Sequence, residues 1–139
     1  SCGCLRAAAA KESIKKLVPQ RTGLGAVRKV YNEYKSSAKE KKRVFEFSLQ
    51  EFYEITQKNC VYCGIIPSKL QRAYYEKNDE TFLYNGIDRV NNIEGYTLEN
   101  SASCCSDCNR AKRCMTKEEF LLWITKVYKY SCEEKCIQQ

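Results

Sequence analysis

The chain contains no histidine, although it has 139 residues and 24 lysines and arginines. Histidine is the side chain that most often accepts a proton near neutral pH, so any acid–base chemistry here must use other groups. The chain also lacks an apolar run close to the ~20 residues that a membrane-spanning helix needs, so we expect no membrane contact. The first residues show neither a signal-peptide pattern nor an initiator methionine, which is compatible with a fragment or a processed product.

Ten cysteines in 139 residues is a high content, and two interpretations compete. Disulfide scaffolds are typical of small secreted proteins, whereas metal sites are typical of reducing compartments. Four of the cysteines form two C-x2-C pairs, Cys60 with Cys63 and Cys105 with Cys108. Tetrahedral zinc commonly takes one such pair from each of two turns, so the pattern favours structural zinc. Cys104 is an alternative to Cys105, although it would form a C-x3-C pair.

Positive charge is concentrated in the N-terminal third. Residues 1–50 hold 12 basic and 4 acidic residues, a net charge of +8, whereas residues 51–139 hold 12 and 13, a net charge of −1. This asymmetry indicates a phosphate-binding arm, and the alternative is a solvated helix face that keeps the protein soluble. The arm is expected to contain helices over 7–18 and 26–43. Its basic candidates for nucleic-acid contact are Arg28, Lys29, Lys35, Lys39, Lys41, Lys42 and Arg43.

Apolar spacing and capping residues predict the remaining helices. Ser48-x-x-Glu51 and Thr116-x-x-Glu119 are capping boxes that each begin a helix. The second helix is expected to reach about residue 130. Residues 67–80 are polar and are expected to form a loop or a short helix. The apolar residues of the second helix recur on one face and are expected to be core: Phe120, Trp123, Ile124 and Val127.

The segment from Tyr84 to Arg113 organises the rest of the chain. A β-prone run reaches residue 90, a turn follows over 91–95, and a second extended piece covers 96–103. A basic helical segment then begins at the second C-x2-C pair. A hairpin, a metal clip and a short helix, holding Asp88 and Asn109 together, favour metal-dependent phosphodiester chemistry.

These motifs carry a family resemblance. C-x2-C, then I-D-R-x-x-N-x-x-G-Y-x-x-x-N, then C-x2-C-N-R-A-K resembles the HNH endonucleases of the ββα-metal (His-Me finger) group. The version with Asp-Arg and a Gly-Tyr turn is similar to phage and mobile-element HNH-like proteins. The match runs from about residue 48 to 130 and is densest over 85–113.

The resemblance implies roles for the matching positions. Asp88 and Asn109 would hold one catalytic divalent cation, Mg²⁺ or Mn²⁺, because hard ions prefer oxygen ligands. Asn100 would be the middle asparagine of the motif and would bond across the hairpin loop. The four C-x2-C cysteines would hold a structural zinc remote from the chemistry. DNA is the implied partner, and Arg110 and Lys112 join the basic residues expected to contact it.

The sequence departs from the family at Arg89, where active members have the general-base histidine. Arginine stays protonated at neutral pH and cannot accept a proton, although it binds phosphate well. Three hypotheses follow. The first is a nuclease that uses metal-bound hydroxide, Tyr84, Glu94 or Tyr96 as base, with Arg89 stabilising charge at phosphorus. The second is a DNA-binding module without cleavage, and the third is a zinc-stabilised structural or interaction domain.

The predicted architecture is α+β: a small zinc-stapled ββα-metal hairpin–helix core with flanking α-helices and a basic N-terminal helical arm. The arm covers 1–43, the HNH-like domain 44–131 and a C-terminal tail 132–139. Cys2 and Cys4 are either the tail of an upstream cysteine-rich module or an unpaired end, and Cys132 and Cys136 are expected to be surface thiols. We expect a reducing intracellular location, the host cytoplasm if the source is a phage or a bacterium. Neither oligomeric state nor target sequence can be read from the chain.

Overall fold

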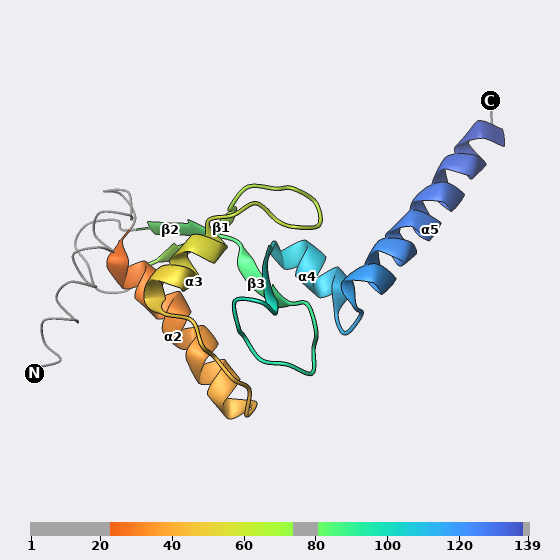
Figure 1. The fold of residues 1–139 in the computed structure, drawn as a ribbon. Helices are drawn as coiled ribbons and strands as arrows, with labels where there is room; N and C mark the ends of the chain where they lie inside the picture. The colour runs from red at the N-terminus through yellow and green to blue at the C-terminus, as the bar shows by residue number, and fades with distance from the viewer. Residues whose placement is uncertain (1–22, 74–80, 138–139) are drawn as a thin grey trace, which may run out of the picture.

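A computed structural model describes residues 23–73 and 81–137, and the predictions on residues 1–22 and 74–80 lie outside this part. The described chain mixes helices with two antiparallel hairpins, so the predicted α+β class is confirmed (Figure 1). The elements, in chain order, are α2 (Leu24–Glu40), α3 (Leu49–Thr56), β1 (Lys69–Arg72), β2 (Thr81–Tyr84), β3 (Gly86–Arg89), β4 (Ser101–Cys104), α4 (Ser106–Lys112) and α5 (Lys117–Ile137).

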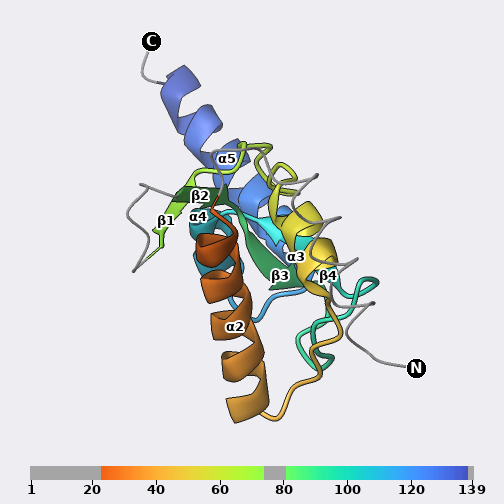
Figure 2. The ribbon, with the colours of Figure 1, turned by 90° about the vertical axis from the view of Figure 1, so that its left-hand side faces the viewer.

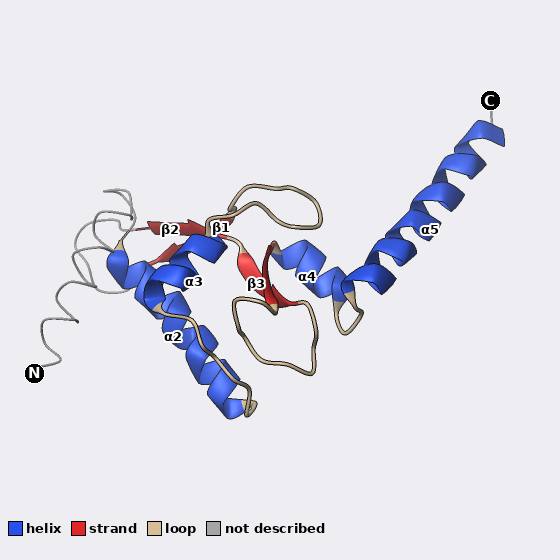
Figure 3. Cartoon of the chain, viewed as in Figure 1, coloured by secondary structure: helices blue, strands red, loops and turns tan. Residues whose placement is uncertain are grey.

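The two hairpins form separate two-stranded sheets (Figure 3). In the first, Lys69 of β1 pairs with Tyr84 of β2, and in the second, Gly86 of β3 pairs with Cys104 of β4. The expectation of a loop or short helix over 67–80 was therefore wrong for residues 69–72. Strand β1 is polar and largely exposed, so it has no apolar alternation of its own. Its partner β2 buries alternate side chains, Phe82 and Tyr84, and pairing with β2 makes this segment a strand.

The hydrophobic core lies where α2 and α3 meet the strands. Val27 and Val30 of α2 pack in one buried cluster with Phe52 of α3, Phe82 of β2 and Ile87 of β3. Figure 2 shows α2 running alongside the rest of this body. The apolar side of α2 is thus part of the same core as the hairpins. This packing presents the opposite, basic side of α2 to solvent.

A hydrogen bond ties α2 to the second hairpin. The backbone N–H of Ile87 donates to the hydroxyl of Tyr34 at 3.0 Å. Burial is the largest cause that raises the pKa of Tyr34 above its ordinary value, so the hydroxyl stays protonated. Helix α2 ends at Glu40. Lys42, with a φ of 53°, then turns the backbone, and Arg43 N–H donates to the carbonyl of Ala38 at 2.8 Å.

The long loop between β3 and β4 packs on the segment that follows α2. Tyr96 N–H donates to Val44 O at 2.8 Å, and Glu46 N–H donates to Tyr96 O at 3.0 Å. A Cβ at Gly95 would lie 2.7 Å from the Val44 nitrogen and 2.8 Å from the Val44 Cβ. Glycine is therefore required here by the close approach of two backbones.

Gly95→Ala is expected to lower the free energy of unfolding by about 1–3 kcal/mol, because the added methyl group separates the loop from Val44. Urea denaturation of the zinc-loaded, reduced protein measures the change. Ile93→Ala is the matched control, since Ile93 lies in the same loop and is 94% exposed. Equal stability of the two variants would contradict the packing argument.

In helix α5, only one of the four residues that were predicted to be core is buried. Phe120 is buried at 1% exposure and packs edge-on against Tyr62 with ring centroids 5.2 Å apart. Beyond it the helix projects away from the body (Figure 1), and the other predicted core residues are exposed by 39–48%: Trp123, Ile124 and Val127. The expectation that they are core was therefore wrong. Amphipathic spacing shows that a face is suited to burial, but it does not supply a partner within the described residues.

Candidate metal cluster and hairpin–helix site

The first C-x2-C pair lies on a tight turn between α3 and β1. Gly64 N–H donates to Cys60 O at 2.9 Å, and Cys60 N–H donates to Ile65 O at 2.9 Å. Gly64 has a φ of 76°, a conformation that side chains with a Cβ rarely adopt. This turn brings Cys60 and Cys63 to the start of α4, where the second pair lies. Cys105 is the N-cap residue of α4, and Cys108 lies in its first turn.

The four cysteines of the two pairs form one cluster. Their sulfur atoms all lie within 4.8 Å of one another, and the Sγ atoms of Cys63 and Cys105 are 3.7 Å apart. Sulfurs around a tetrahedral zinc at ~2.3 Å are about 3.8 Å from each other, so the cluster has the dimensions of a zinc site. Cys104 is fully buried, and its thiol donates to the carbonyl of Cys105 at 3.4 Å. The cluster therefore contains Cys105 and excludes Cys104.

The hydrogen bonds of the turn favour a thiolate at Cys60. Burial alone would raise the pKa of Cys60, but backbone hydrogen bonds from Cys105, Cys63 and Tyr62 together lower it to about 6. A thiolate is the form that binds a metal ion. The pKa of Cys108 is instead raised, first by burial and then by hydrogen bonds to neighbouring thiols, and the pKa of Cys63 is raised as well. Cys60 is therefore the first thiolate of the cluster, and the other cysteines lose their protons as the metal binds.

Asp88 lies on β3 and is 4% exposed. Its Oδ1 and Oδ2 atoms are each 3.2 Å from the ammonium nitrogen of Lys112. Oδ2 also accepts a hydrogen bond from the hydroxyl of Tyr62 at 2.7 Å. Asp88, Lys112 and Tyr62 therefore form one hydrogen-bonded polar group, with Asp88 and Lys112 buried and Tyr62 partly buried, which joins the hairpin, α4 and the cysteine turn.

Lys112 was predicted to contact DNA, and the structure contradicts this. Its side chain is fully buried, and besides Asp88 it donates to the carbonyl of Arg89 at 3.3 Å. The sequence pattern of a lysine at the end of a basic helix predicts a surface charge, but the side chain of Lys112 faces the β3–β4 hairpin. Arg110, in contrast, is 80% exposed and pairs with Asp107 at 2.8 Å, an interaction of little energetic weight.

Sequence reasoning assigned no role to Tyr62. Its position between Cys60 and Cys63 was the available signal, since a polar aromatic residue inside a metal turn is held in a fixed place. Burial is the first cause that raises the pKa of Tyr62, and its hydrogen bond to Asp88 raises it further. Tyr62 therefore remains a hydrogen-bond donor to the carboxylate and is not suited to act as a base.

Arg89 is engaged in the β3–β4 loop. Its Nη1 atom donates to the carbonyls of Asn92 at 2.7 Å and Glu94 at 3.0 Å. The guanidinium carbon lies 5.6 Å from the centre of the Tyr96 ring, within the range of a cation–π contact. Arg89 therefore shapes the loop, and a phosphate would have to bind the remaining N–H groups of the guanidinium.

Asn100 closes the same loop from its other end. Its side-chain nitrogen donates to Asn91 O at 3.0 Å and to Gly95 O at 2.9 Å, and its side-chain oxygen accepts from Asn91 N–H at 2.8 Å. Asn100 is 5% exposed. These contacts join Asn100 to both Asn91 and Gly95, so in this structure Asn100 stabilises the loop between β3 and β4.

Asn109 lies on α4, one turn before Lys112. Residues three apart share a face of a helix, so the face that holds Lys112 against Asp88 also carries Asn109. Asn109 is partly exposed and lines a shallow surface depression of about 570 Å³ with Ser106 and Arg110. The hairpin–helix unit thus carries a partly exposed amide on α4 and, on β3, a buried carboxylate that contacts Lys112 of the same helix.

The donor set at this unit suits a hard cation. A carboxylate and an amide oxygen are the ligand types that Mg²⁺ and Mn²⁺ prefer. The ammonium group of Lys112 on Asp88 shows that the position already attracts positive charge. Asp88 and Asn109 are therefore compatible with one divalent ion, provided that the Lys112 ammonium group leaves the carboxylate.

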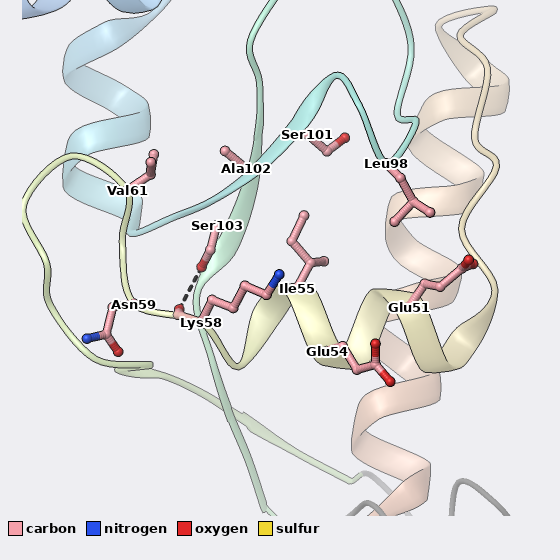
Figure 4. A pocket seen from close by; sticks show the side chains of 10 residues that line it. All are labelled: Glu51, Glu54, Ile55, Lys58, Asn59, Val61, Leu98, Ser101, Ala102 and Ser103. Atoms are coloured by element: carbon pink, nitrogen blue, oxygen red, sulfur yellow. Dashed lines mark hydrogen bonds between the residues drawn. The ribbon is translucent and has the colours of Figure 1, made fainter.

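A separate pocket of about 310 Å³ lies between α3 and β4 (Figure 4). Glu51 and Glu54 line one side, Lys58 lies near the turn, and Ser103 donates to Lys58 O at 2.7 Å. None of Asp88, Arg89 and Asn109 lines this pocket. Its two carboxylates make it unsuited to a phosphate backbone.

The basic residues predicted for DNA contact lie mainly on the outer side of α2 and just after it. Arg28, Lys35 and Lys39 are exposed and follow one another at seven- and four-residue spacing, which places them in one line along the helix. Lys41 and Lys42 are also exposed, whereas Lys29 and Arg43 are partly buried. The end of this line adjoins Val44, which holds the β3–β4 loop. This line of basic side chains therefore runs toward the β3–β4 hairpin.

Comparisons with known sequences find one similar viral protein. No family model matches the chain. Among curated proteins it is 33% identical over 118 residues to an uncharacterised protein of Acanthamoeba polyphaga mimivirus. That match covers 81% of this chain but 20% of the viral protein, so the chain spans one fifth of the length of that relative. None of the helices in the described part is both long and apolar enough to cross a membrane.

Among solved structures, the chain is similar to the rare-cutting HNH restriction endonuclease PacI. The TM-score is 0.53 at 20% sequence identity, and the match covers 75% of this chain and 78% of that chain. At this level of identity the likeness concerns the fold. The ββα arrangement of β3, β4 and α4, with a four-cysteine cluster beside it, is an HNH-like fold.

Proposed function

We propose that this chain is an HNH-type endonuclease domain that binds DNA and hydrolyses its phosphodiester bonds, in one strand or in both. The observation that carries the proposal is the hairpin–helix unit, in which Asp88 on β3 faces the side of α4 that carries Asn109. The likeness to an HNH restriction endonuclease supports this assignment at the level of the fold.

Two metal ions belong to the proposal. A structural zinc is held by Cys60, Cys63, Cys105 and Cys108, whose sulfurs are within 4.8 Å of one another. Such a site needs reduced thiols, so we place the protein in a reducing intracellular compartment. Asp88 and Asn109 hold one Mg²⁺ or Mn²⁺, which, when bound, withdraws charge from the scissile phosphate.

Arg89 cannot take the proton of the attacking water, because its guanidinium stays charged at neutral pH. Of the alternatives named from the sequence, Tyr84 is 2% exposed within the core and is removed from consideration. The Tyr96 ring lies 5.6 Å from the guanidinium carbon of Arg89, so one face of the ring is already occupied by a cation. Glu94 is exposed, and its carboxylate Oε1 accepts a hydrogen bond from the side chain of Asn91 at 2.9 Å, so it is the candidate base that we retain in this loop.

A cleavage assay tests the activity. The zinc-loaded, reduced protein is incubated with supercoiled and single-stranded DNA in the presence of Mg²⁺ or Mn²⁺. Asp88→Asn is expected to slow cleavage by at least about 100-fold, because it removes the charged ligand of the cation. Asp107→Asn, an exposed aspartate of α4, is the control and is expected to cleave at the rate of the parent. A parent that does not cleave, or an Asp88→Asn variant as fast as the parent, would refute endonuclease activity.

A second function has one observation in its favour. Lys112 neutralises Asp88, so a domain that binds DNA without cutting it is also consistent with this geometry. This alternative predicts DNA binding without added Mg²⁺ or Mn²⁺ and no cleavage with either ion. The same cleavage assay therefore separates the two functions.

DNA binding through α2 is expected to depend on salt. Changing Lys35 and Lys39 to glutamine removes two charges from the exposed line, so the slope of log affinity against log salt should fall by about two. Fluorescence anisotropy with labelled duplex DNA measures the slope. Changing Lys126 and Lys129 on α5 to glutamine leaves the same net charge and is the matched control. Equal slopes for the two double variants would contradict a DNA contact along α2.

A further inference from the structure

We infer that Lys112 is a built-in competitor for the divalent cation at Asp88, so that a cation binds there only when the ammonium group moves away. The inference rests on the proposed function for the identity of the cation site, but it concerns the contact between two residues of this chain. Lys112 and Asp88 are 0% and 4% exposed in their side chains and lie 3.2 Å apart.

The contacts of Lys112 are specific to the hairpin. Its nitrogen reaches both oxygens of Asp88 and the carbonyl of Arg89, all within 3.3 Å. These three acceptors can satisfy the three N–H groups of an ammonium ion. A buried charge is stable when it is paired and hydrogen-bonded, and Lys112 meets both conditions. The ammonium group is therefore held in place as a ligand of the carboxylate.

Two cations cannot share this carboxylate without cost. A divalent ion at Asp88 would lie within a few ångströms of the lysine charge, where repulsion in a buried site is strong. The four-carbon stem of lysine is flexible, so the ammonium group is able to withdraw. The affinity measured for a divalent ion is then reduced by the free energy of separating Lys112 from Asp88.

Tyr62 fixes the position of the Asp88 carboxylate for which the two cations compete. It donates to Oδ2 of Asp88 at 2.7 Å and belongs to the turn between Cys60 and Cys63. The aromatic ring is fixed by edge-on packing against Phe120. Asp88 is thus held at a constant place by the cysteine turn while its cationic partner is exchanged. This arrangement also supplies an optical probe, because a phenol this close sensitises a lanthanide bound at the carboxylate.

The test uses Tb³⁺ as the probe, in the absence of DNA. Tb³⁺ is a hard ion that selects oxygen ligands, so the thiolates keep their zinc. Luminescence excited through tyrosine is titrated in the zinc-loaded parent and in Lys112→Met, which keeps much of the side-chain volume and removes the charge. The variant is expected to bind at least 10-fold more tightly. Lys126→Met, an exposed lysine of α5, is expected to match the parent, and adding Asp88→Asn to Lys112→Met is expected to abolish the tight site.

The melting temperature provides a second measurement if Lys112→Met folds poorly. Mg²⁺ is expected to raise the melting temperature of this variant and to leave that of the parent almost unchanged, because the ion replaces the missing charge. A variant that binds Tb³⁺ no more tightly than the parent and gains no stability from Mg²⁺ would overturn the inference. Cleavage plays no part in either readout, so absent nuclease activity and an absent competition are distinguished.

A second inference comes independently from α5: we infer that its exposed apolar face joins two copies of this chain. Within one 180° arc of the helix, beyond the docked Phe120, six apolar or aromatic side chains are 39–68% exposed: Leu121, Trp123, Ile124, Val127, Tyr128 and Tyr130. Leu122, Lys126 and Lys129 lie on the opposite side by the 3.6-residue period. The described helix therefore has one apolar and one mixed face.

The size of this face fits a pair of identical helices. A fully exposed aromatic side chain has about 150–250 Å² of surface. Because the six side chains of the arc are each about half exposed, together they present on the order of 600 Å² in one chain. Two copies packed face to face would bury roughly 1,200 Å², which exceeds the ~1,000 Å² expected of a specific interface. A contiguous apolar patch of this size is at the upper end of the roughly 300–600 Å² that the largest patch of a monomer covers, and such patches often mark interaction sites.

Sedimentation velocity of the reduced, zinc-loaded protein tests this interface. The parent is expected to sediment as a dimer at micromolar concentration, and Val127→Lys as a monomer with an unchanged melting curve. Leu122→Lys, which changes a 71% exposed leucine on the opposite face, is expected to remain a dimer. A monomeric parent, or dissociation by Leu122→Lys and not by Val127→Lys, would overturn the inference.

Discussion

Removing the metal from the four-cysteine cluster is expected to unfold the hairpin–helix unit. The cluster joins the turn at Cys60 to the start of α4, and the hairpin between them buries few apolar side chains of its own. Structural zinc contributes about 10–16 kcal/mol of apparent binding free energy, which equals or exceeds the ~5–15 kcal/mol of a typical domain. Thermal melting followed by circular dichroism, with and without a strong chelator and always with a reductant, measures the loss.

Serine substitutions distinguish the effect of losing a cluster cysteine from the effect of losing another thiol. Cys60→Ser is expected to reproduce the effect of chelation, because it removes a buried ligand. Cys114→Ser is the matched control, since Cys114 is an exposed free cysteine outside the cluster, and it should melt like the parent. A chelated protein that keeps the parental melting curve would show that the cluster holds no structural metal.

Asp88→Ala is expected to lower the free energy of unfolding by about 3–5 kcal/mol. The change leaves Lys112 with a buried charge and no carboxylate, and it leaves the Tyr62 hydroxyl without its acceptor. The loss is larger than that of an ordinary surface aspartate, which is within about 0.5 kcal/mol. Urea denaturation of the zinc-loaded protein gives the value.

A double-mutant cycle shows whether this cost belongs to the pair. When Asp88→Ala is combined with Lys112→Met, neither charge remains unpaired, and the double variant is expected to lose less stability than the two single variants together. Additive losses would mean that Asp88 and Lys112 act independently. The cycle measures stability alone and does not depend on whether the protein cleaves DNA.

The cysteine cluster shows how much spacing alone can predict. Two C-x2-C pairs predict a tetrahedral site because each pair can take a tight turn around one ion, whatever lies between them. The structure brings all four sulfurs together and turns Cys104 away, as the spacing indicated. The role of Asn100 came from the family resemblance, and the need for glycine at position 95 comes from the close approach of Val44, so spacing alone predicts neither.

For Lys112 and for helix α5, the sequence pattern does not determine which side chains are buried. A lysine after Asn109 and Arg110 has the pattern of a solvated helix end, and only the packing of α4 on β3 turns it inward. The apolar face of α5 has the period of a buried helix, yet the described part of the chain covers only its first turn. Periodicity specifies a face, whereas burial requires a second surface.

The sequence by itself determined the elements that depend on local chemistry: the cysteine turns, the capped helices, the hairpin loop and the charge asymmetry between the two ends of the chain. The first three follow from residue spacing within short stretches, and the charge asymmetry follows from the composition of the two parts of the chain. Only the tertiary structure decided which charges meet, because Asp88, Lys112 and Tyr62 are separated by 24 and 26 residues along the chain. Their contact requires β3, α4 and the cysteine turn to pack together, and it makes Asp88 a buried ion-pair partner as well as a candidate metal ligand.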